Sequence, residues 1–387
     1  MSTHQPTLER PTTPRTVTVG FRPDIQALRA LAVGLVVVHH LWPMKLTAGF
    51  VGVDAFFVLS GYLITAQLTH EIDRTGRIRI ADFYARRVRR LLPAALLVLV
   101  TVVVAVHALV PHDRWADYAR QVLASALYGQ NWLLGAHPVD PYKVTGLVHF
   151  WSLSVEEQFY LVWPLLLLLL FKLRAPAARL AGVAALGLVS LAWCIHLTEA
   201  DANAAFFTTP VRVWEFAIGA GIALIGSRLV LPRTVANVAS LVGFGALVGS
   251  AVQFTALTPY PGSAALVPSL GAALVIVAGS GRERQWHTPL TSSKPVQLLG
   301  DISYSLYLWH WPLLILAPLA VSGGVLDFPV RLGVLASALV LAYLSKRLVE
   351  DPVRTWPVLT ANTRLTFLAM VAALATVALA AGSLLWA

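Results

Sequence analysis

The sequence predicts an all-α membrane protein, a bundle of about 10–11 transmembrane helices. Of its 387 residues, 57% are hydrophobic and only 12% are charged, whereas a soluble domain carries about 25% charged residues. Apolar runs of roughly 20 residues, the length that crosses a bilayer core of about 30 Å, recur along the whole chain. A protein this apolar could not cover its surface with polar groups, so a lipid bilayer is its expected solvent.

Eleven runs are expected to cross the membrane. They lie at residues 25–42, 49–69, 91–110, 150–171, 179–198, 210–227, 234–256, 264–280, 301–320, 329–347 and 365–386. The first run contains Arg29 and His40 and precedes no small-residue cleavage site, so it belongs to the mature protein rather than to a signal peptide. Residues 112–136 are amphipathic and too polar to span, and are expected to lie on the surface or to re-enter between helices.

The distribution of basic residues predicts the topology. With the N-terminus in the cytoplasm, 23 of the 29 Lys and Arg residues fall in inside segments, as the positive-inside rule requires. The formal charge of +10 is therefore explained by short cytoplasmic loops rather than by a nucleic-acid partner. Residues 1–20 read as a disordered cytoplasmic tail, residues 21–356 as the main transmembrane domain, and residues 365–386 as an additional helix with an extracytoplasmic C-terminus.

Arg29 and His40 are the first candidates for chemistry, because ionisable groups inside membrane helices are costly and commonly functional. They are eleven residues apart, so they share one helix face about 16 Å apart along the axis. A guanidinium suits a phosphate, and a neutral imidazole suits proton abstraction from a hydroxyl. The alternative is that Arg29 reaches lipid headgroups and His40 is a packed histidine.

The second run, GFVGVDAFFVLSGYLIT, places Asp54 within the membrane and Ser60 and Tyr62 near its middle. Asp54 is a candidate catalytic residue, and the two hydroxyls are candidate substrate contacts. Three glycines in this run allow another helix or a ligand to approach closely, namely Gly49, Gly52 and Gly61. The alternative is helix packing around a paired aspartate.

The loop before the third run ends in FYARRVRRLLP. Arg87 and Arg90 are three residues apart and lie on one helical face, where they could hold a phosphate-rich anion from the cytoplasm. Arg86 and Arg89 have the same spacing. The alternative is a basic anchor of the positive-inside kind.

The stretch HFWSLSVEEQFYLVWP enters the fourth run from outside. Glu156 and Glu157 are two acids at membrane depth beside aromatic rings, an arrangement that suits a sugar or polyol acceptor. An interfacial aromatic belt would explain the rings but not the acids. The other candidate substrate contacts of this stretch are His149, Trp151, Ser152 and Gln158.

Further polar residues support these candidates. Arg212 and Glu215 are three apart and are expected to pair. The ninth run adds His310, a candidate substrate contact, beside three hydroxyl residues, Ser303, Tyr304 and Tyr307. VEDPVR, around Glu350, reads as structural. The single cysteine, Cys194, excludes a disulfide framework or a cysteine metal cluster, and no metal site is expected.

Six segments, in order, resemble the acyltransferase family 3 of membrane proteins, the bacterial O-antigen O-acetylase type. They are FRPDIQALRALAVGLVVVHH, GFVGVDAFFVLSGYLIT, RRVRRLLP, HFWSLSVEEQFYLVWP, SYSLYLWHWP and VEDPVR. The resemblance covers residues 21–356. The family's Arg-x10-His pair falls on Arg29 and His40, its Arg-x-x-Arg on Arg87 and Arg90, and its Trp-Ser-Leu-x-x-Glu on the segment that ends at Glu156.

The resemblance implies a bacterial plasma-membrane enzyme that moves an acetyl or other short acyl group from acyl-CoA to a hydroxyl. Acceptors in the family are glycans, lipids and macrolide-type natural products. Many members carry an extra helix and a fused extracytoplasmic domain similar to SGNH hydrolases. Here the extra helix is present and the sequence given holds no such domain.

We therefore expect acyl-CoA to bind through Arg29, Arg87 and Arg90, with His40 taking the proton of the acceptor hydroxyl. Asp54 or Glu156 would orient the imidazole or the acceptor, and an acyl-histidine intermediate is an open alternative. A transporter or flippase of an acylated glycolipid would use the same intramembrane charges as a substrate path. A third reading is a membrane anchor for an outer domain, for which His40 would be dispensable.

Overall fold

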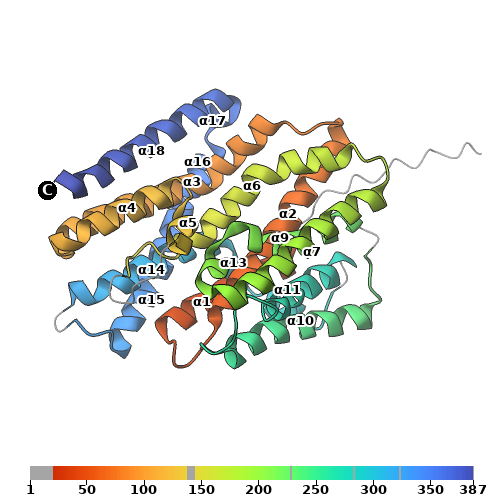
Figure 1. Cartoon of the computed structure of the whole chain (residues 1–387), viewed down its shortest axis with the longest axis horizontal. Helices are drawn as coiled ribbons and strands as arrows, with labels where there is room; N and C mark the ends of the chain where they lie inside the picture. Colours follow the sequence, from red (N-terminus) through yellow and green to blue (C-terminus); the bar gives the residue numbers. More distant parts are fainter. Residues whose placement is uncertain (1–20, 137–143, 227–228, 282–283, 322–323, 387) are drawn as a thin grey trace, which may run out of the picture.

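The computed structural model describes residues 21–136, 144–226, 229–281, 284–321 and 324–386, and the regular secondary structure of these residues is helical throughout (Figure 1). The predicted tail, residues 1–20, lies outside the described residues. The elements are α1 (Pro23–Leu41), η1 (Gly49–Val51), α2 (Gly52–Thr75), α3 (Ile80–Leu109), η2 (His112–Arg114), α4 (Trp115–Ala126), α5 (Gln130–Ala136), α6 (Phe150–Phe171), α7 (Pro176–Ala200), α8 (Ala202–Phe207), η4 (Thr209–Val211), α9 (Val213–Ile225), α10 (Arg233–Gln253), α11 (Leu266–Ala278), η6 (Gly279–Gly281), α12 (Thr288–Thr291), α13 (Lys294–Asp301), α14 (Ser303–Ala320), α15 (Phe328–Ser345), η7 (Lys346–Glu350), α16 (Asp351–Thr355), α17 (Pro357–Ala361) and α18 (Thr363–Trp386).

Each of the eleven predicted membrane segments contains a helix, which confirms the all-α fold class. Within the described residues, eight helical segments are long and apolar enough to cross a bilayer, and two shorter apolar helices run over Val213–Ile225 and Leu266–Gly281. The remaining predicted segment contains α14, which has 18 residues but carries two prolines and several polar side chains. The protein is therefore a multi-pass membrane protein.

The third membrane helix begins well before its predicted boundary. α3 begins at Ile80, whereas the third membrane run was predicted from residue 91, because the amphipathic stretch before it is helical and continues without a break into the apolar run. The amphipathic stretch at 112–136 folds into η2, α4 and α5. α4 buries Trp115, Tyr118 and Val122 and packs against α3 and α18.

The helices pack around two cores, and α1, α2 and α9 contribute buried residues to both. One core is formed mainly by α2, α3, α4, α6, α14, α15 and α18, and the other by α1, α2, α9, α10 and α11. Figure 1 shows α18 lying beside α3 and α4 along one edge of the bundle, and α10 and α11 along the opposite edge. α1 and α2 lie between these edges (Figure 1).

Glycines bring α2 into contact with both of its neighbours, as expected from the sequence. A Cβ on Gly52 would strike the carbonyl oxygen of Ala32 on α1, and a Cβ on Gly61 would strike that of Phe216 on α9. From the other side, Gly219 of α9 meets the backbone of α2. The close approach of the backbones fixes the position of α2, which carries Ser60 and Tyr62.

Candidate active site

The first candidate cavity, here called the arginine cavity, has a volume of about 540 Å³ and lies towards the N-terminal end of α1. Arg29 enters it from α1, and Arg87 and Arg90 enter it from α3. Arg29 donates to the side chain of Gln26 at 3.1 Å. The structure thus brings together the three arginines that the sequence marked for anion binding.

The structure also decides between the two possible arginine pairs. Arg90 is exposed to the cavity and makes no hydrogen bond or ion pair with any described residue, while the Arg87 guanidinium stacks 3.7 Å from the centre of the Tyr160 ring. Arg86 instead forms an ion pair of 3.0 Å with Glu71 on α2. Arg89 is buried and donates to α17 and α18. Of these two pairs, Arg87 and Arg90 are therefore the one that lines the arginine cavity.

A hydroxyl–carboxylate group forms one wall of the arginine cavity. The Ser60 and Tyr160 hydroxyls both donate to Oε1 of Glu156, and Tyr160 lies 2.8 Å from Ser60 Oγ. Arg87 covers the Tyr160 ring, so a positive charge lies beside this carboxylate. Tyr160, which the sequence showed only as one of several aromatic residues, is thus the residue that joins α2, α3 and α6 here.

The second candidate cavity, here called the histidine cavity, has a volume of about 200 Å³ and lies at the opposite end of α1. His40 lines it from α1, His149 lies at the start of α6, and Trp311 lies on α14. Trp151 and the rings of α8 complete an aromatic wall. A cavity lined by aromatic faces and imidazoles suits a sugar ring or another polyol.

His40 contacts a second histidine that lines neither cavity. Its Nδ1 lies 2.9 Å from Nε2 of His310, a buried residue of α14. The two rings are nearly parallel, with an interplanar angle of 7° and centroids 5.2 Å apart. The Trp311 ring stands edge-on to His40, with centroids 4.5 Å apart. His310, predicted from the sequence as a substrate contact, thus lies against His40.

The arginine and histidine cavities meet at a common wall. Val53 and Tyr307 line both of them. The Tyr307 hydroxyl lies 2.7 Å from Ser152 Oγ and donates to the carbonyl oxygen of His149 at 2.9 Å. Ser152 lines the arginine cavity and His149 the histidine cavity, so Tyr307 spans the boundary between them.

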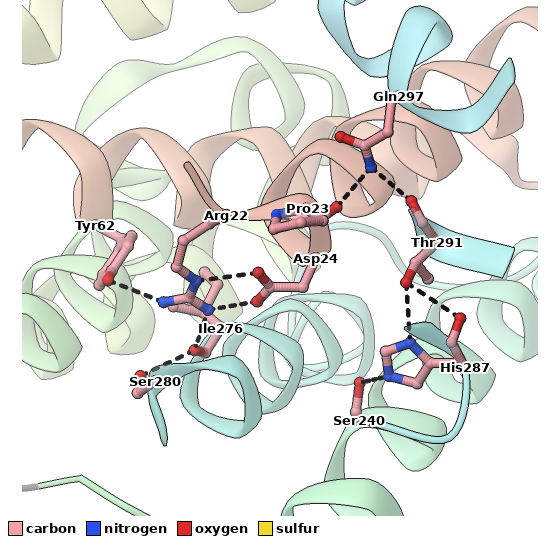
Figure 2. Close-up of polar contacts among 10 residues, drawn as sticks. All are labelled: Arg22, Pro23, Asp24, Tyr62, Ser240, Ile276, Ser280, His287, Thr291 and Gln297. Carbon is pink, nitrogen blue, oxygen red and sulfur yellow. Dashed lines mark hydrogen bonds and ion pairs between the residues drawn. The ribbon is translucent and has the colours of Figure 1, made fainter. Parts of the chain in front are cut away.

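A third, polar cavity of about 760 Å³ adjoins the arginine cavity, and Arg22 and Tyr62 line both. Figure 2 shows that Arg22 donates hydrogen bonds to both carboxylate oxygens of Asp24, to the Tyr62 hydroxyl and to the carbonyl oxygen of Ile276. Burial alone would lower the pKa of Arg22, but the hydrogen bond and charge of Asp24 and the contact with Tyr62 raise it overall. Arg22 therefore uses four of its five N–H donors in bonds to these three residues.

The same network ties the start of α1 to α12 and α13. Gln297 donates to the carbonyl oxygens of Pro23, at 3.0 Å, and Thr291, at 2.5 Å (Figure 2). His287 lies 2.6 Å from Ser240 Oγ and 3.3 Å from Thr291 Oγ1. Burial lowers the pKa of His287 below its ordinary value. These bonds hold the end of α1 that carries Arg29.

Asp54, expected near the reacting groups, lies in a separate buried cluster. Arg212 donates to Asp54 Oδ1 at 2.7 Å, and Tyr260 donates to Oδ2. Arg212 Nε also lies 3.3 Å from Glu215 Oε1, which confirms the pair predicted from the sequence. Asp54 lines neither the arginine nor the histidine cavity among the described residues. The cluster joins α2 to α9, with Tyr260 packed against it.

Two further predicted contacts also lie away from these cavities. Glu157 and Gln158 are absent from the described linings of the arginine and histidine cavities. Gln158 donates to the Tyr128 carbonyl oxygen and to Asn131, at 2.8 and 2.9 Å, and so fastens α6 to α5 and the turn before it. The contacts of Gln158 are therefore those of a residue that connects helices.

The VEDPVR segment, which the sequence indicates to be structural, bonds to a neighbouring helix. Glu350 accepts a hydrogen bond from Ser305 on α14, and Asp351 pairs with Lys346 at 2.6 Å and with Arg354 at 3.1 Å. The first bond holds η7 against α14, the helix that carries His310, and the other two tie α16 to η7 and close its own turn.

The described part of the chain contains no group of three or more His, Cys, Asp or Glu side chains that could hold a metal ion. The residues that converge are instead three arginines, one carboxylate with two hydroxyls, and histidines beside aromatic rings. Together they define a helical membrane protein in which a cavity lined by arginines shares a wall with a smaller cavity lined by histidines.

Comparison with known proteins gives the family. The profile of an acyltransferase domain, acyltransferase family 3, matches residues 22–347. The chain belongs to this family of membrane acyltransferases.

Curated relatives support the assignment. The chain is 32% identical over 350 residues to the peptidoglycan O-acetyltransferase OatA of Listeria monocytogenes, an alignment that covers 86% of this chain and 56% of the relative. It is 31% identical to the O-acetyltransferase OatA of Staphylococcus aureus (strain NCTC 8325), with 86% and 57% covered. A putative O-acetyltransferase of S. aureus (strain MRSA252) is 30% identical, with 90% and 60% covered. The chain thus spans less than two thirds of the length of these relatives, and no solved structure matches it.

Proposed function

We propose that this protein transfers an acetyl group from acetyl-CoA to a hydroxyl of an envelope glycan, a glycolipid or a small natural product. The observation that carries the proposal is the meeting of the arginine and histidine cavities at Val53 and Tyr307. This junction would let one extended donor reach from the arginines to the histidine. The relatives named O-acetyltransferases support acetyl as the acyl group, and one is named for peptidoglycan.

The donor would bind from the cytoplasm. With the N-terminus inside, the arginine cavity opens at the cytoplasmic end of α1, where Arg87 and Arg90 would hold the phosphates of CoA and Arg29 would lie deeper. Arg90 is the best placed of the three, because it makes no bond with any described residue. Phosphate oxygens would supply the acceptors that guanidinium groups require.

The reaction would take place where the cavities meet. The pantetheine arm would run past Glu156 and bring the thioester carbonyl towards Tyr307. An acceptor hydroxyl in the histidine cavity would lose its proton to His40 as its oxygen attacks that carbonyl carbon. The carbon–sulfur bond then breaks, the ester forms, and the thiolate of CoA takes up the proton that His40 received.

Ser60, Tyr160 and Glu156 would hold the donor rather than react with it. The Glu156 carboxylate already accepts two hydrogen bonds from protein hydroxyls. Its charge lies beside Arg87, which stacks on Tyr160. The group would keep Arg87 in place when no donor is bound.

Release of free CoA from acetyl-CoA tests the proposal. Purified protein in nanodiscs would be assayed with and without peptidoglycan fragments, as wild type, His40→Gln and His107→Gln. His107 is a matched control: it is also a helical histidine, with its Nδ1 2.9 Å from a backbone carbonyl oxygen, but it lines none of the three cavities described above.

We expect the fragments to stimulate CoA release by the wild type and by His107→Gln, and His40→Gln to be at least about 10²-fold slower. Folded protein that binds no acetyl-CoA, or that releases CoA equally well without His40, would refute the proposal and favour transport or anchoring.

A further inference from the structure

The protonation state of His310 follows from its neighbours. Its Nδ1 lies 2.6 Å from the carbonyl oxygen of Tyr307 and 3.2 Å from that of Leu306. A carbonyl oxygen can only accept a hydrogen bond, so Nδ1 of His310 must carry a proton. In the neutral ring, Nε2 of His310 then carries the lone pair.

That lone pair determines the tautomer of His40. Nε2 of His310 lies 2.9 Å from Nδ1 of His40. Two lone pairs cannot bond to each other, so Nδ1 of His40 must donate the hydrogen. Nε2 of neutral His40 therefore carries the lone pair. It has no hydrogen-bond partner in the described part of the chain, and the ring of His40 lines the histidine cavity.

We propose that His310 is a positioning residue, which keeps His40 in the Nδ1–H tautomer with Nε2 free to take a proton from the acceptor hydroxyl. This inference rests on the proposed function and adds a role that the sequence did not assign to His310. The opposite tautomer would point an N–H bond at the acceptor and could not act as a base.

The same bond serves both charge states of His40. When Nε2 takes the proton, Nδ1 still donates to His310, so neither ring has to turn during the reaction. Packing keeps the rings in place: His310 is 1% exposed, and Trp311 is held by a hydrogen bond of 3.0 Å to the carbonyl oxygen of Thr145. Backbone carbonyls of α14 thus set the orientation of a base on α1.

The carboxylates that could have oriented His40 are bonded elsewhere. Asp54 is held by Arg212 and Tyr260. Glu156 accepts from Ser60 and Tyr160 in the arginine cavity. In the structure, the contact that can fix the His40 ring nitrogen is therefore His310.

Two substitutions at position 310 test the proposal by steady-state kinetics. His310→Leu removes the acceptor, whereas His310→Gln places an amide oxygen that can accept from His40 Nδ1. We expect kcat of His310→Leu to fall by about 10²-fold, the scale of general-base catalysis. His310→Gln should recover at least about tenfold of this loss, and the KM for acetyl-CoA should stay within about twofold in both. His107→Leu is the matched control and should keep wild-type kcat.

A spectroscopic measurement reads the tautomer without turnover. In protein labelled with ¹⁵N-histidine, a nitrogen that carries a lone pair resonates far from one that carries hydrogen, and His40→Gln identifies the His40 signals by their loss. We expect a lone pair on Nε2 in the wild type and a mixture of tautomers in His310→Leu. A lone pair on Nδ1 in the wild type, or full activity of His310→Leu, would overturn the inference. A wild type without acetyltransferase activity would instead refute the proposed function, while the spectrum would still report the tautomer.

Discussion

Replacing Arg90 by glutamine separates donor binding from folding, because the guanidinium lies in the arginine cavity and has no bond with any described residue. Its removal leaves no protein group without a partner, so the fold should be unaffected. If Arg90 binds a phosphate of CoA, the variant loses a charge-assisted hydrogen bond of about 1.5–3 kcal/mol. Because about 1.4 kcal/mol corresponds to a factor of ten, KM for acetyl-CoA should rise roughly 10- to 100-fold.

The assay is CoA release over a range of donor concentrations, with S-acetyl-pantetheine, which lacks the phosphates, as the comparison substrate. For that thioester the wild type and Arg90→Gln should have similar KM. Arg86→Gln is the matched control, because Arg86 lies outside the cavity lining and pairs with Glu71 across a partly exposed contact. An unchanged KM for acetyl-CoA in Arg90→Gln, or an equal rise for both substrates, would refute the reasoning.

Three further predictions concern the scaffold, each read by thermal unfolding in detergent. Gly61→Leu should destabilise by about 1–3 kcal/mol or more, because its Cβ would strike the Phe216 carbonyl oxygen, whereas Gly34→Ala, with open space at its Cβ, should be neutral or stabilising. Arg212→Met should cost about 3–5 kcal/mol by leaving the buried carboxylate of Asp54 without its countercharge, and an unchanged melting temperature would contradict this. Because burial lowers the pKa of His287, its contribution to the free energy of unfolding should be fully present above about pH 6.5 and lost as the pH falls towards the folded pKa. The melting temperature of His287→Gln should therefore fall less on acidification than that of the wild type. Parallel plots of melting temperature against pH for the two proteins would argue against this.

Hydropathy located the helices but not all of their ends. Each apolar run became a helix because a bilayer leaves the backbone few other ways to satisfy its hydrogen bonds. The start of α3 was missed because an amphipathic helix of eleven residues, from Ile80, does not differ from a polar loop in hydropathy. Charge counts favour a cytoplasmic N-terminus, and this topology stays a prediction.

Helical spacing predicted part of the site. It placed Arg29 and His40 on one face of α1, and each lines one of the two cavities that share a wall. It could not separate Arg87 and Arg90 from Arg86 and Arg89, because that choice depends on which helices pack against each face of α3. In the second pair, Arg86 forms an ion pair with Glu71, and Arg89 donates hydrogen bonds to α17 and α18.

The sequence could not predict which side chains far apart in the chain contact one another. Asp54 looked like a catalytic acid, but its partner Arg212 lies 158 positions away in the chain. His310 lies 270 positions from His40, and nothing in either segment signals that the two rings meet. The roles assigned to these residues in catalysis stay proposals.

Transfer of acetyl across the bilayer is the central claim, and sidedness tests it most directly. Radiolabelled acetyl-CoA would be added outside proteoliposomes that hold peptidoglycan fragments in their lumen, and base-labile acetyl on the trapped fragments would be measured. We predict labelled lumenal product that is lost in His40→Gln and strongly reduced in Arg90→Gln at low donor concentration. Product formed only when donor and acceptor share one side of the membrane would contradict the claim.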